Sequence, residues 1–519
     1  PFRKHGPNRR YTEDRTLSSS EPTTYINDLS PEDARQYFLI SKSYFDMDLP
    51  PYFNFQPLLE FACSEASQLE VSDILKWKPQ NDSDVNYSLL HNKDGEIGWR
   101  PFELINPLIY GKCVQLITEP TNWQSIKIRF AEFQSGVVEC CSMPVIALED
   151  QNATKEQILN WWKRVEQRSL ELSLEYSHVR LTDVSNCYPS IYSHAIGWAI
   201  HGREFLKHKD NRWNKKLLGN QLDEMIRNSR EGQTNGIPQA SLLSHVLAEL
   251  VLGYCDTLID QSLDSKDEVK ILRYRDDYRI FGSSDTACQK ALKVISEKLN
   301  LFGMKLGAVK TTGAVNVISG AVKSDKLDAL SLNLKQRTLQ KELLLIHQFA
   351  QSQPSSGALK FLLSQFLDRL SWRIKKKYLG NENITVLTSI LMDLASTSPH
   401  VFPAVATAIS QLMEILEESQ RGKLFALVLK RTQRIPNSGY METWLQRIAE
   451  PNNLTFFSPE KLCAQINDDH PCLWNFDWVG DEKLRSSLEK YSVVDRAEVD
   501  QLPNHIVRSE FDAFWKGYD

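Results

Sequence analysis

Two adjacent acidic residues, Asp276 and Asp277, interrupt an apolar and aromatic stretch, LRYRDDYRIFG at 272–282. Neighbouring carboxylates repel each other, and their burial costs free energy unless something positive lies beside them. A third carboxylate, Asp183, ends the stretch HVRLTD at 178–183. Oxygen ligands suit hard cations such as Mg²⁺, and two such ions about 4 Å apart catalyse phosphoryl transfer. The three residues therefore predict a two-metal site, although a DD pair by itself is more often an exposed turn.

Two strands and a turn are needed to bring these carboxylates together. The segments HVRLTDVS (178–185) and EVKILRYR (268–275) have strand patterns, and a helix is expected to follow the first. Strand and helix patterns mix from about 85 to 330, which indicates an α+β layer arrangement. NWQSIKIRF (122–130) alternates apolar and polar residues, so a half-exposed strand is expected there, with Lys127 on a solvated face.

The length of the chain sets its organisation. At 519 residues it is too long for one hydrophobic core, so two or three domains are expected. We predict an N-terminal segment at 1–84 that joins the next domain, an α+β domain at 85–330, and an all-α C-terminal domain at 331–519. In the last, Leu362 and Phe366 belong to a helical apolar stripe, with stacked helix pairs as one arrangement.

Composition excludes several classes of protein. Hydrophobic residues make up 41% of the chain and charged residues 24%, as in an ordinary globular protein. Nine cysteines form no CxxC pair and are read as reduced thiols. We see no membrane-spanning run and no signal peptide, and therefore expect a cytoplasmic protein without a membrane partner. A net charge of −5 argues against a protein whose whole surface binds nucleic acid, but it is compatible with a local basic channel.

Four motifs in order carry a resemblance to a known family. They are Asp183 with Tyr188 five positions later, GIPQAS at 236–241, YRDD at 274–277 and LGAVKT at 306–311. Together they resemble the successive palm motifs of reverse transcriptases. Upstream, NKDGEIGWRPFELINPLIYGK at 92–112 resembles the fingers segment of that family. The resemblance implies an α+β palm and fingers followed by the helical domain.

The exact residues of three segments indicate one group within this family. DVSNCYPSIYSH (183–194), RYRDDYRIF (273–281) and SYFDMDLPPYFNF (43–55) look most like the abortive-infection (Abi) and related defence-associated bacterial reverse transcriptases. That group also carries a helical domain after the palm. The Pro50–Pro51 pair breaks helices on either side, so segment 43–55 is expected to be extended and packed.

The family resemblance assigns roles to residues of this chain. Catalysis falls to Asp183, Asp276, Asp277 and Lys310, the last as a proton donor to pyrophosphate. The nucleotide-binding residues are Lys93, Arg100, Tyr188, Gln239 and Arg275. Two Mg²⁺ ions, with Mn²⁺ as an alternative, would be bound at Asp183, Val184, Asp276 and Asp277.

Several of these residues also have simpler interpretations. Tyr188 would exclude a ribose 2′-OH, or else pack in the core. Lys310 is otherwise an exposed surface lysine. Arg275 departs from the small or apolar residue usual at that position and hints at an unusual primer, unless it turns outward into solvent. Ala240 replaces the usual Gly, and its methyl group would narrow the template slot. Gln239 is expected where a helix opens, near nucleotide or template.

These resemblances imply a DNA polymerase of reverse-transcriptase type in bacterial antiphage defence. Protein-primed synthesis follows from the Abi resemblance, either without a template or from a dedicated non-coding RNA. Tyr44 is the favoured priming residue, and an aromatic packing role is the alternative. The implied partners are dNTPs, the DNA product, the non-coding RNA and further copies of the chain. A conventional RNA-templated enzyme of retron or intron type and an inactive nucleic-acid-binding scaffold are the other hypotheses.

Overall fold

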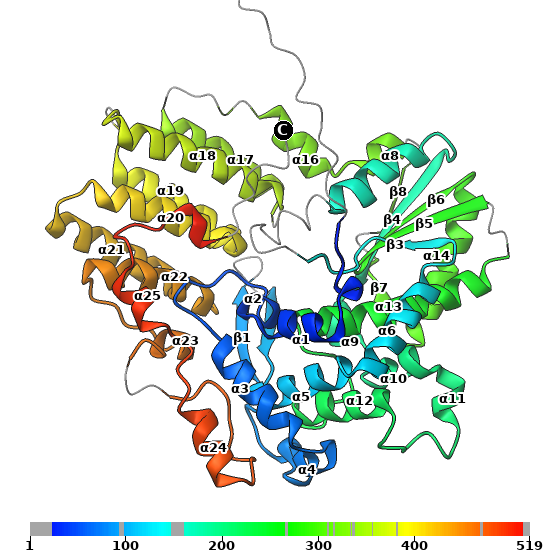
Figure 1. The fold of residues 1–519 in the computed structure, drawn as a ribbon. Helices are drawn as coiled ribbons and strands as arrows, with labels where there is room; N and C mark the ends of the chain where they lie inside the picture. Colours follow the sequence, from blue (N-terminus) through cyan, green and yellow to red (C-terminus); the bar gives the residue numbers. More distant parts are fainter. Residues whose placement is uncertain are drawn as a thin grey trace, which may run out of the picture.

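The computed structural model describes most of the chain (Figure 1). The described residues are 23–92, 98–146, 160–264, 268–308, 311–314, 317–332, 334, 338–354, 356–379, 382–467 and 471–511. A twisted sheet lies on one side of the molecule and a stack of helices on the other, with the N-terminal helices between them.

A six-stranded sheet of order β3-β5-β6-β4-β7, in which β8 also pairs with β4, carries the acidic motifs. Its strands are β3 (Val138–Cys140), β4 (His178–Ser185), β5 (Val269–Tyr274), β6 (Asp277–Gly282), β7 (Lys305–Leu306) and β8 (Thr312–Ala314). Among the strand pairs of the described residues in this sheet, β3–β5 alone is parallel. The strands predicted at 178–185 and 268–275 are therefore confirmed.

Helices cover both faces of the sheet because neighbouring strand residues point to opposite sides. Ile271 and Ile280 join the main core beside α13 (Leu242–Ser262) and α14 (Asp285–Asn300). Leu272 and Phe281 face a second cluster that includes residues of α8 (Arg168–Leu172) and α15 (Val317–Ala321). Within the described residues, α13 is the one helix long and apolar enough to cross a membrane, and most of it is buried in the protein.

The fingers contain a two-stranded sheet, β1 (Tyr87–Asn92) and β2 (Trp99–Leu104), followed by α5 (Pro107–Ile117) and α6 (Pro120–Phe133). Helix α3 (Gln56–Ser67) packs closely on α5, where a Cβ at Gly111 would lie 2.8 Å from the Cys63 backbone.

The strand expected at 122–130 is wrong, because this segment lies in helix α6. Glu119 caps the helix by accepting from the Asn122 amide at 3.0 Å, and Pro120 begins it. Trp123, Ile126 and Phe130 are buried at helical spacing, whereas Ile128 is half exposed. The helical period therefore decides the buried face, and the alternation of apolar residues was incidental.

Six helices build the stack in the C-terminal half: α17 (Leu339–Ser352), α18 (Ala358–Lys375), α19 (Ile384–Thr397), α20 (Phe402–Glu414), α21 (Glu418–Thr432) and α22 (Gly439–Ala449). Each helix from α17 to α20 also contacts the next but one, as in stacked helix pairs. Leu362 and Phe366 are buried, so the predicted helical stripe is confirmed.

The chain end then returns to the N-terminal region. Helices α23 (Lys461–Ala464), α24 (Glu482–Glu489) and α25 (Arg496–Asp500) follow the stack. The Asn54 amide donates to the Val493 carbonyl at 2.8 Å, and the Asp495 amide donates to the Tyr52 carbonyl at 2.8 Å. The N-terminal segment is packed here, between α2 (Ser41–Tyr44) and α3, as its proline pair predicts.

Candidate active site

The β5–β6 hairpin places the paired aspartates at its tip. Tyr274 pairs with Asp277, so Arg275 and Asp276 form a two-residue turn, and Arg275 has a φ of +54°. A positive φ at the first turn position is typical of tight hairpin turns. On the other side of β6, Asp183 pairs directly with Asp277, which sets both side chains on one face of the sheet.

Asp183 is held at the middle of the sheet with little solvent access. Asp183 is 6% exposed, and its backbone carbonyl accepts a hydrogen bond from the Gly307 amide at 2.8 Å. A Cβ at Gly307 would lie 2.3 Å from Asp183 Oδ1, so only glycine leaves room for this carboxylate. The fourth motif thus runs beside Asp183, although Lys310 itself lies outside the described residues.

The donor chemistry of this corner suits a divalent cation. Asp183 and Asp277 supply carboxylate oxygens from neighbouring strands, and the Val184 amide donates to the Asp276 carbonyl at 3.0 Å, which ties the turn to β4. Among the described residues, no three acidic, histidine or cysteine side chains are already grouped as metal ligands. The predicted trio is therefore brought to one corner of the sheet without a formed three-ligand cluster.

Tyr188 belongs to a hydrogen-bonded series of three side chains, Tyr188, His245 and Asp46, beside the hairpin. It lies on α9 (Cys187–Ser190), and its hydroxyl is 2.6 Å from His245 Nδ1. His245 Nε2 is in turn 2.8 Å from an Asp46 carboxylate oxygen. Because a carboxylate only accepts, Nε2 carries the hydrogen, and in the neutral ring Nδ1 accepts from the tyrosine. Burial opposes the charge of Asp46, but His245 and Arg275 lower the pKa of this carboxyl overall.

Arg275 lies on the same side of the hairpin as Tyr188 and His245. It lines a small cavity together with Tyr188, His245 and Glu249. Arg275 is half-buried and shares this cavity with residues of α9 and α13, so the alternative of an arginine directed outward into solvent is not borne out.

A fully buried arginine, Arg273, supports the hairpin from below. Its Nε donates to Asp256 at 2.6 Å, and its guanidinium reaches Glu249 at 3.0 Å and the Arg275 carbonyl at 3.1 Å. Burial raises the pKa of Asp256 to about 6, despite the neighbouring guanidinium. One guanidinium thus compensates the buried carboxyl groups of Asp256 and Glu249 under the turn that carries Asp276.

The loop before α13 differs from expectation in one respect. Gln239 does not open the helix, because Ser241 is its N-cap and accepts from the Ser244 amide. Instead, the Gln239 carbonyl accepts from the Glu103 amide of β2 at 3.0 Å. Ala240 is buried with a φ of +92°, a conformation that favours glycine. The replacement of the usual glycine therefore strains this loop.

Arg100 lies at a cavity between the fingers and the helical stack. It is the cross-strand partner of His91, and the cavity of about 340 Å³ is also lined by Lys360 and His400 from the stack and by Asp46. Burial and the positive charges of His400, Arg100 and Lys360 lower the pKa of His91 to about 3. Burial and Lys360 lower the pKa of His400 to about 4. Four basic groups thus gather here, and Lys93 lies outside the described residues.

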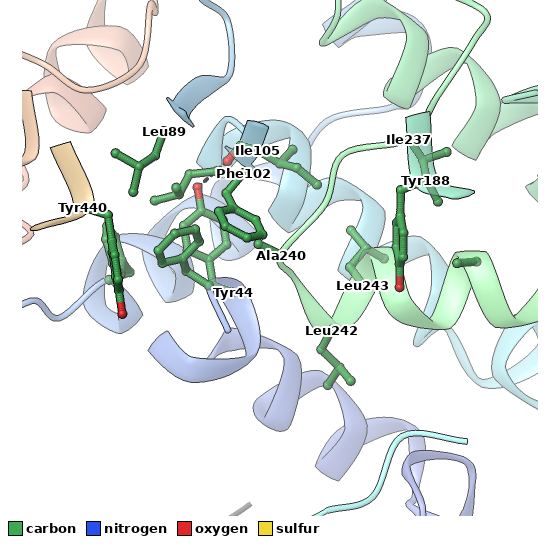
Figure 2. Close-up of a cluster of buried hydrophobic side chains, with 14 of the residues drawn as sticks. Tyr44, Leu89, Phe102, Ile105, Tyr188, Ile237, Ala240, Leu242, Leu243 and Tyr440 are labelled. Carbon is green, nitrogen blue, oxygen red and sulfur yellow. Dashed lines mark hydrogen bonds between the residues drawn. The ribbon is translucent and has the colours of Figure 1, made fainter. Parts of the chain in front are cut away.

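Tyr44 is a packing residue in this structure. Its ring is fully buried, 4.8 Å from the Tyr110 ring centroid, and its hydroxyl donates to the Ile105 carbonyl. Figure 2 shows it on the opposite side of the Ala240 loop from Tyr188. Its role in priming stays a prediction.

Several residues of the site were given no role by the sequence. His245, Lys360 and His400 lie outside the quoted motifs, whereas Asp46 and Arg273 lie inside the segments 43–55 and 273–281 without an assigned role. One weak signal existed, because His245 is polar within the apolar run LLSHVLAEL of α13.

A comparison with protein families assigns the chain to a known family. The family model "Reverse transcriptase (RNA-dependent DNA polymerase)" matches residues 92–380, more than half of the chain. No match was found among curated proteins. Among solved structures, apo telomerase from Candida tropicalis shares 13% identity over 73% of this chain and 67% of that one, with a TM-score of 0.29. Telomerase from Candida albicans with a TWJ fragment of telomeric RNA shares 12% identity over 72% and 67%, with a TM-score of 0.30. The chain, with its α+β palm and fingers and its helical C-terminal region, belongs to the reverse transcriptase family.

Proposed function

We propose that the chain polymerises deoxynucleotides with two divalent metal ions bound by Asp183, Asp276 and Asp277. The in-register pairing of Asp183 and Asp277 beside the Asp276 turn is the observation that carries this proposal. When bound, the ions would activate the attacking hydroxyl and stabilise the charge on the leaving pyrophosphate. Gly307 keeps the space around Asp183 open for a ligand.

The incoming nucleotide would lie between the Arg100 cavity and Tyr188. Arg100 offers a planar fork for phosphate oxygens, and Lys360 adds a second cation from the stack. Asp46 links the two places, because it lines the Arg100 cavity and also contacts His245, the partner of Tyr188. A triphosphate at Arg100 would therefore place its sugar toward the tyrosine.

Antiphage defence and protein priming form the finer part of the proposal. They rest on the resemblance of the sequences at 43–55, 183–194 and 273–281 to the Abi group, and on the helical stack after the palm. Template-free synthesis, copying of a dedicated non-coding RNA and assembly of several copies belong to the same inference. A conventional RNA-templated enzyme is the second candidate, since the family model is that of RNA-dependent DNA polymerases.

The polymerase proposal is tested with the purified full chain, Mg²⁺ and each dNTP in turn, with and without RNA that co-purifies. Asp183→Asn and Asp276→Asn keep side-chain size and remove charge, so each should reduce incorporation at least about 100-fold. Glu297→Gln, on the exposed face of α14, is the control and should retain full activity. Near-normal incorporation by the Asp183 or Asp276 variant would refute the two-metal assignment.

Priming is tested on protein recovered from the same reaction. After digestion, mass spectrometry should detect a tyrosyl peptide that carries a nucleotide, and Tyr44→Phe should lose it if Tyr44 is the acceptor. An adduct on another tyrosine would exclude Tyr44 as the priming residue but would leave protein priming in place. A product free of protein after denaturation would exclude protein priming and favour the conventional enzyme.

A further inference from the structure

A basic segment connects α10 (His194–His201) to α12 (Leu218–Asn228) at the edge of the palm. Its sequence, GREFLKHKDNRWNKK at 202–216, has six Lys or Arg residues and two acidic ones, in a chain of net charge −5. Figure 1 shows α11 (Arg203–Lys207) at the periphery, well away from the β5–β6 hairpin. This basic segment therefore lies outside the candidate active site.

Aromatic side chains are interleaved with these cations. Trp213 is 74% exposed and Phe205 49% exposed, unusual for such large apolar rings. The Arg212 guanidinium lies 5.0 Å from the Trp213 ring centroid. Arg203 and Lys207 lie 5.4 and 5.8 Å from the ring of Trp198. Exposed rings beside cations offer surfaces on which bases stack while phosphates are neutralised.

Several of these side chains line a cavity of about 430 Å³, which we call the Trp213 pocket. Its lining includes Trp198, Lys207, Arg212, Trp213, Lys215 and Glu224. Within the described part of the chain, the buried Oε2 of Glu224 has no hydrogen-bond partner. A buried acceptor costs free energy unless a donor reaches it, and base edges carry N–H donors. The lining of the pocket thus combines aromatic faces, cationic side chains and a buried acceptor.

We propose that the Trp213 pocket binds single-stranded nucleic acid at a site separate from the polymerase centre. One unstacked base lies against Trp213, with an N–H edge toward Glu224. Lys207, Arg212 and Lys215 neutralise the neighbouring phosphates. The aromatic faces and the acidic acceptor favour a nucleic acid over an acidic polypeptide, which would need only the cations.

Fluorescence anisotropy on the full chain tests the proposal, with labelled 12-nucleotide RNA and DNA strands and no dNTP. Trp213→Ala should weaken binding about 10-fold, while an abasic strand of equal length should bind the variant and the natural chain equally. Arg212→Gln with Lys215→Gln should lower the salt-dependence slope by about 1.4. Lys293→Gln, an exposed lysine of α14, is the control and should change neither.

A photo-crosslinking measurement separates this pocket from the polymerase centre. A strand containing 5-bromouridine should crosslink to a peptide that includes Trp213, and Asp276→Asn should leave that crosslink intact. Tighter binding of the RNA strand or of the DNA strand would show which of the two nucleic acids the pocket binds. Unchanged affinity of Trp213→Ala, crosslinks confined to other peptides, or displacement of the strand by polyglutamate would each overturn the proposal.

Discussion

Tyr188 is oriented by two residues from distant parts of the chain. Its hydroxyl bonds to His245, which is fixed in turn by Asp46, and its ring lies edge-on to the imidazole at 5.7 Å. A side chain that excludes a 2′-OH by contact must not move, because a small displacement would admit the extra oxygen. If Tyr188 excludes the 2′-OH as proposed, the His245–Asp46 pair acts on sugar choice through the position of Tyr188.

Removal of the imidazole should loosen the sugar selection. His245→Ala is expected to raise ribonucleotide use relative to deoxynucleotide use about 10-fold, which corresponds to about 1.4 kcal/mol. His245→Asn retains an acceptor near the position of Nδ1 and should restore part of the discrimination. The measurement is kcat/KM for dNTP and rNTP in single-nucleotide assays. Equal ratios in all three proteins would mean that His245 serves packing alone.

Ala240 is a second residue whose conformation has a measurable cost. Ala240→Gly should raise the free energy of unfolding by about 1 kcal/mol, because relief of the positive φ outweighs the added entropy of the unfolded chain. Urea denaturation measures the change. Ala248→Gly, in the middle of α13, is the matched control and should destabilise the protein. A loss of stability in Ala240→Gly would show that the loop is not strained.

The β5–β6 hairpin depends on charges buried beneath it. Arg273 on β5 joins Asp256 and Glu249 of α13, and also bonds the carbonyl of Arg275 in the turn. Strand and helix are thus fixed relative to each other by one guanidinium. The same contact sets the position of the turn that carries Asp276.

Truncation of this guanidinium should be strongly destabilising. Arg273→Met leaves two carboxylates buried without their cation and is expected to cost about 3–5 kcal/mol in urea denaturation. Lys270→Met on the same strand removes a partly exposed ion pair to Glu139 and should cost less than about 1 kcal/mol. Similar losses for the two variants would contradict the role assigned to Arg273.

At the scale of the whole molecule, the helical stack closes on the fingers. Asn92 donates to the Pro436 carbonyl at 2.9 Å, and Trp474 donates to the Leu104 carbonyl at 3.1 Å. His91 lies 5.2 Å from the Tyr440 ring, and His400 faces the same cavity from the stack. The two neutral histidines therefore lie where the halves of the protein meet.

This interface should make stability sensitive to mild acid. The unfolded chain binds protons at histidine near pH 6.5, whereas the folded pKa values of His91 and His400 are lowered to about 3 and 4. Between these limits only the unfolded state gains protons, so the free energy of unfolding falls as pH decreases. The expected loss from pH 6.5 to 5 is about 1.6 kcal/mol for each histidine.

His400→Asn should flatten this pH profile, and His208→Asn, at an exposed site, should leave it unchanged. Thermal unfolding between pH 7 and pH 5 measures both. Parallel profiles for His400→Asn and the natural chain would show that the interface histidine titrates normally.

The sequence alone determined the strands beside the aspartates and the reverse-transcriptase character of the chain. Both depend on local patterns, namely strand patterns and motifs in fixed order, whereas the structure placed Arg275 in a two-residue turn with Asp276 instead of in the predicted strand. Local patterns also misled, because the apolar alternation at 122–130 suits a strand, whereas burial follows the helical face of α6. Periodicity identifies an element only when the buried side is known.

Only the tertiary structure decided which groups surround the motif residues. Asp46 and His245 are 199 positions apart, yet their contact orients Tyr188. Arg100 meets Lys360 and His400 only because the helical stack closes on the fingers. Such contacts have no local signature, since packing of remote segments creates them, and a lone lysine or histidine in a helix looks the same whether it faces solvent or a nucleotide.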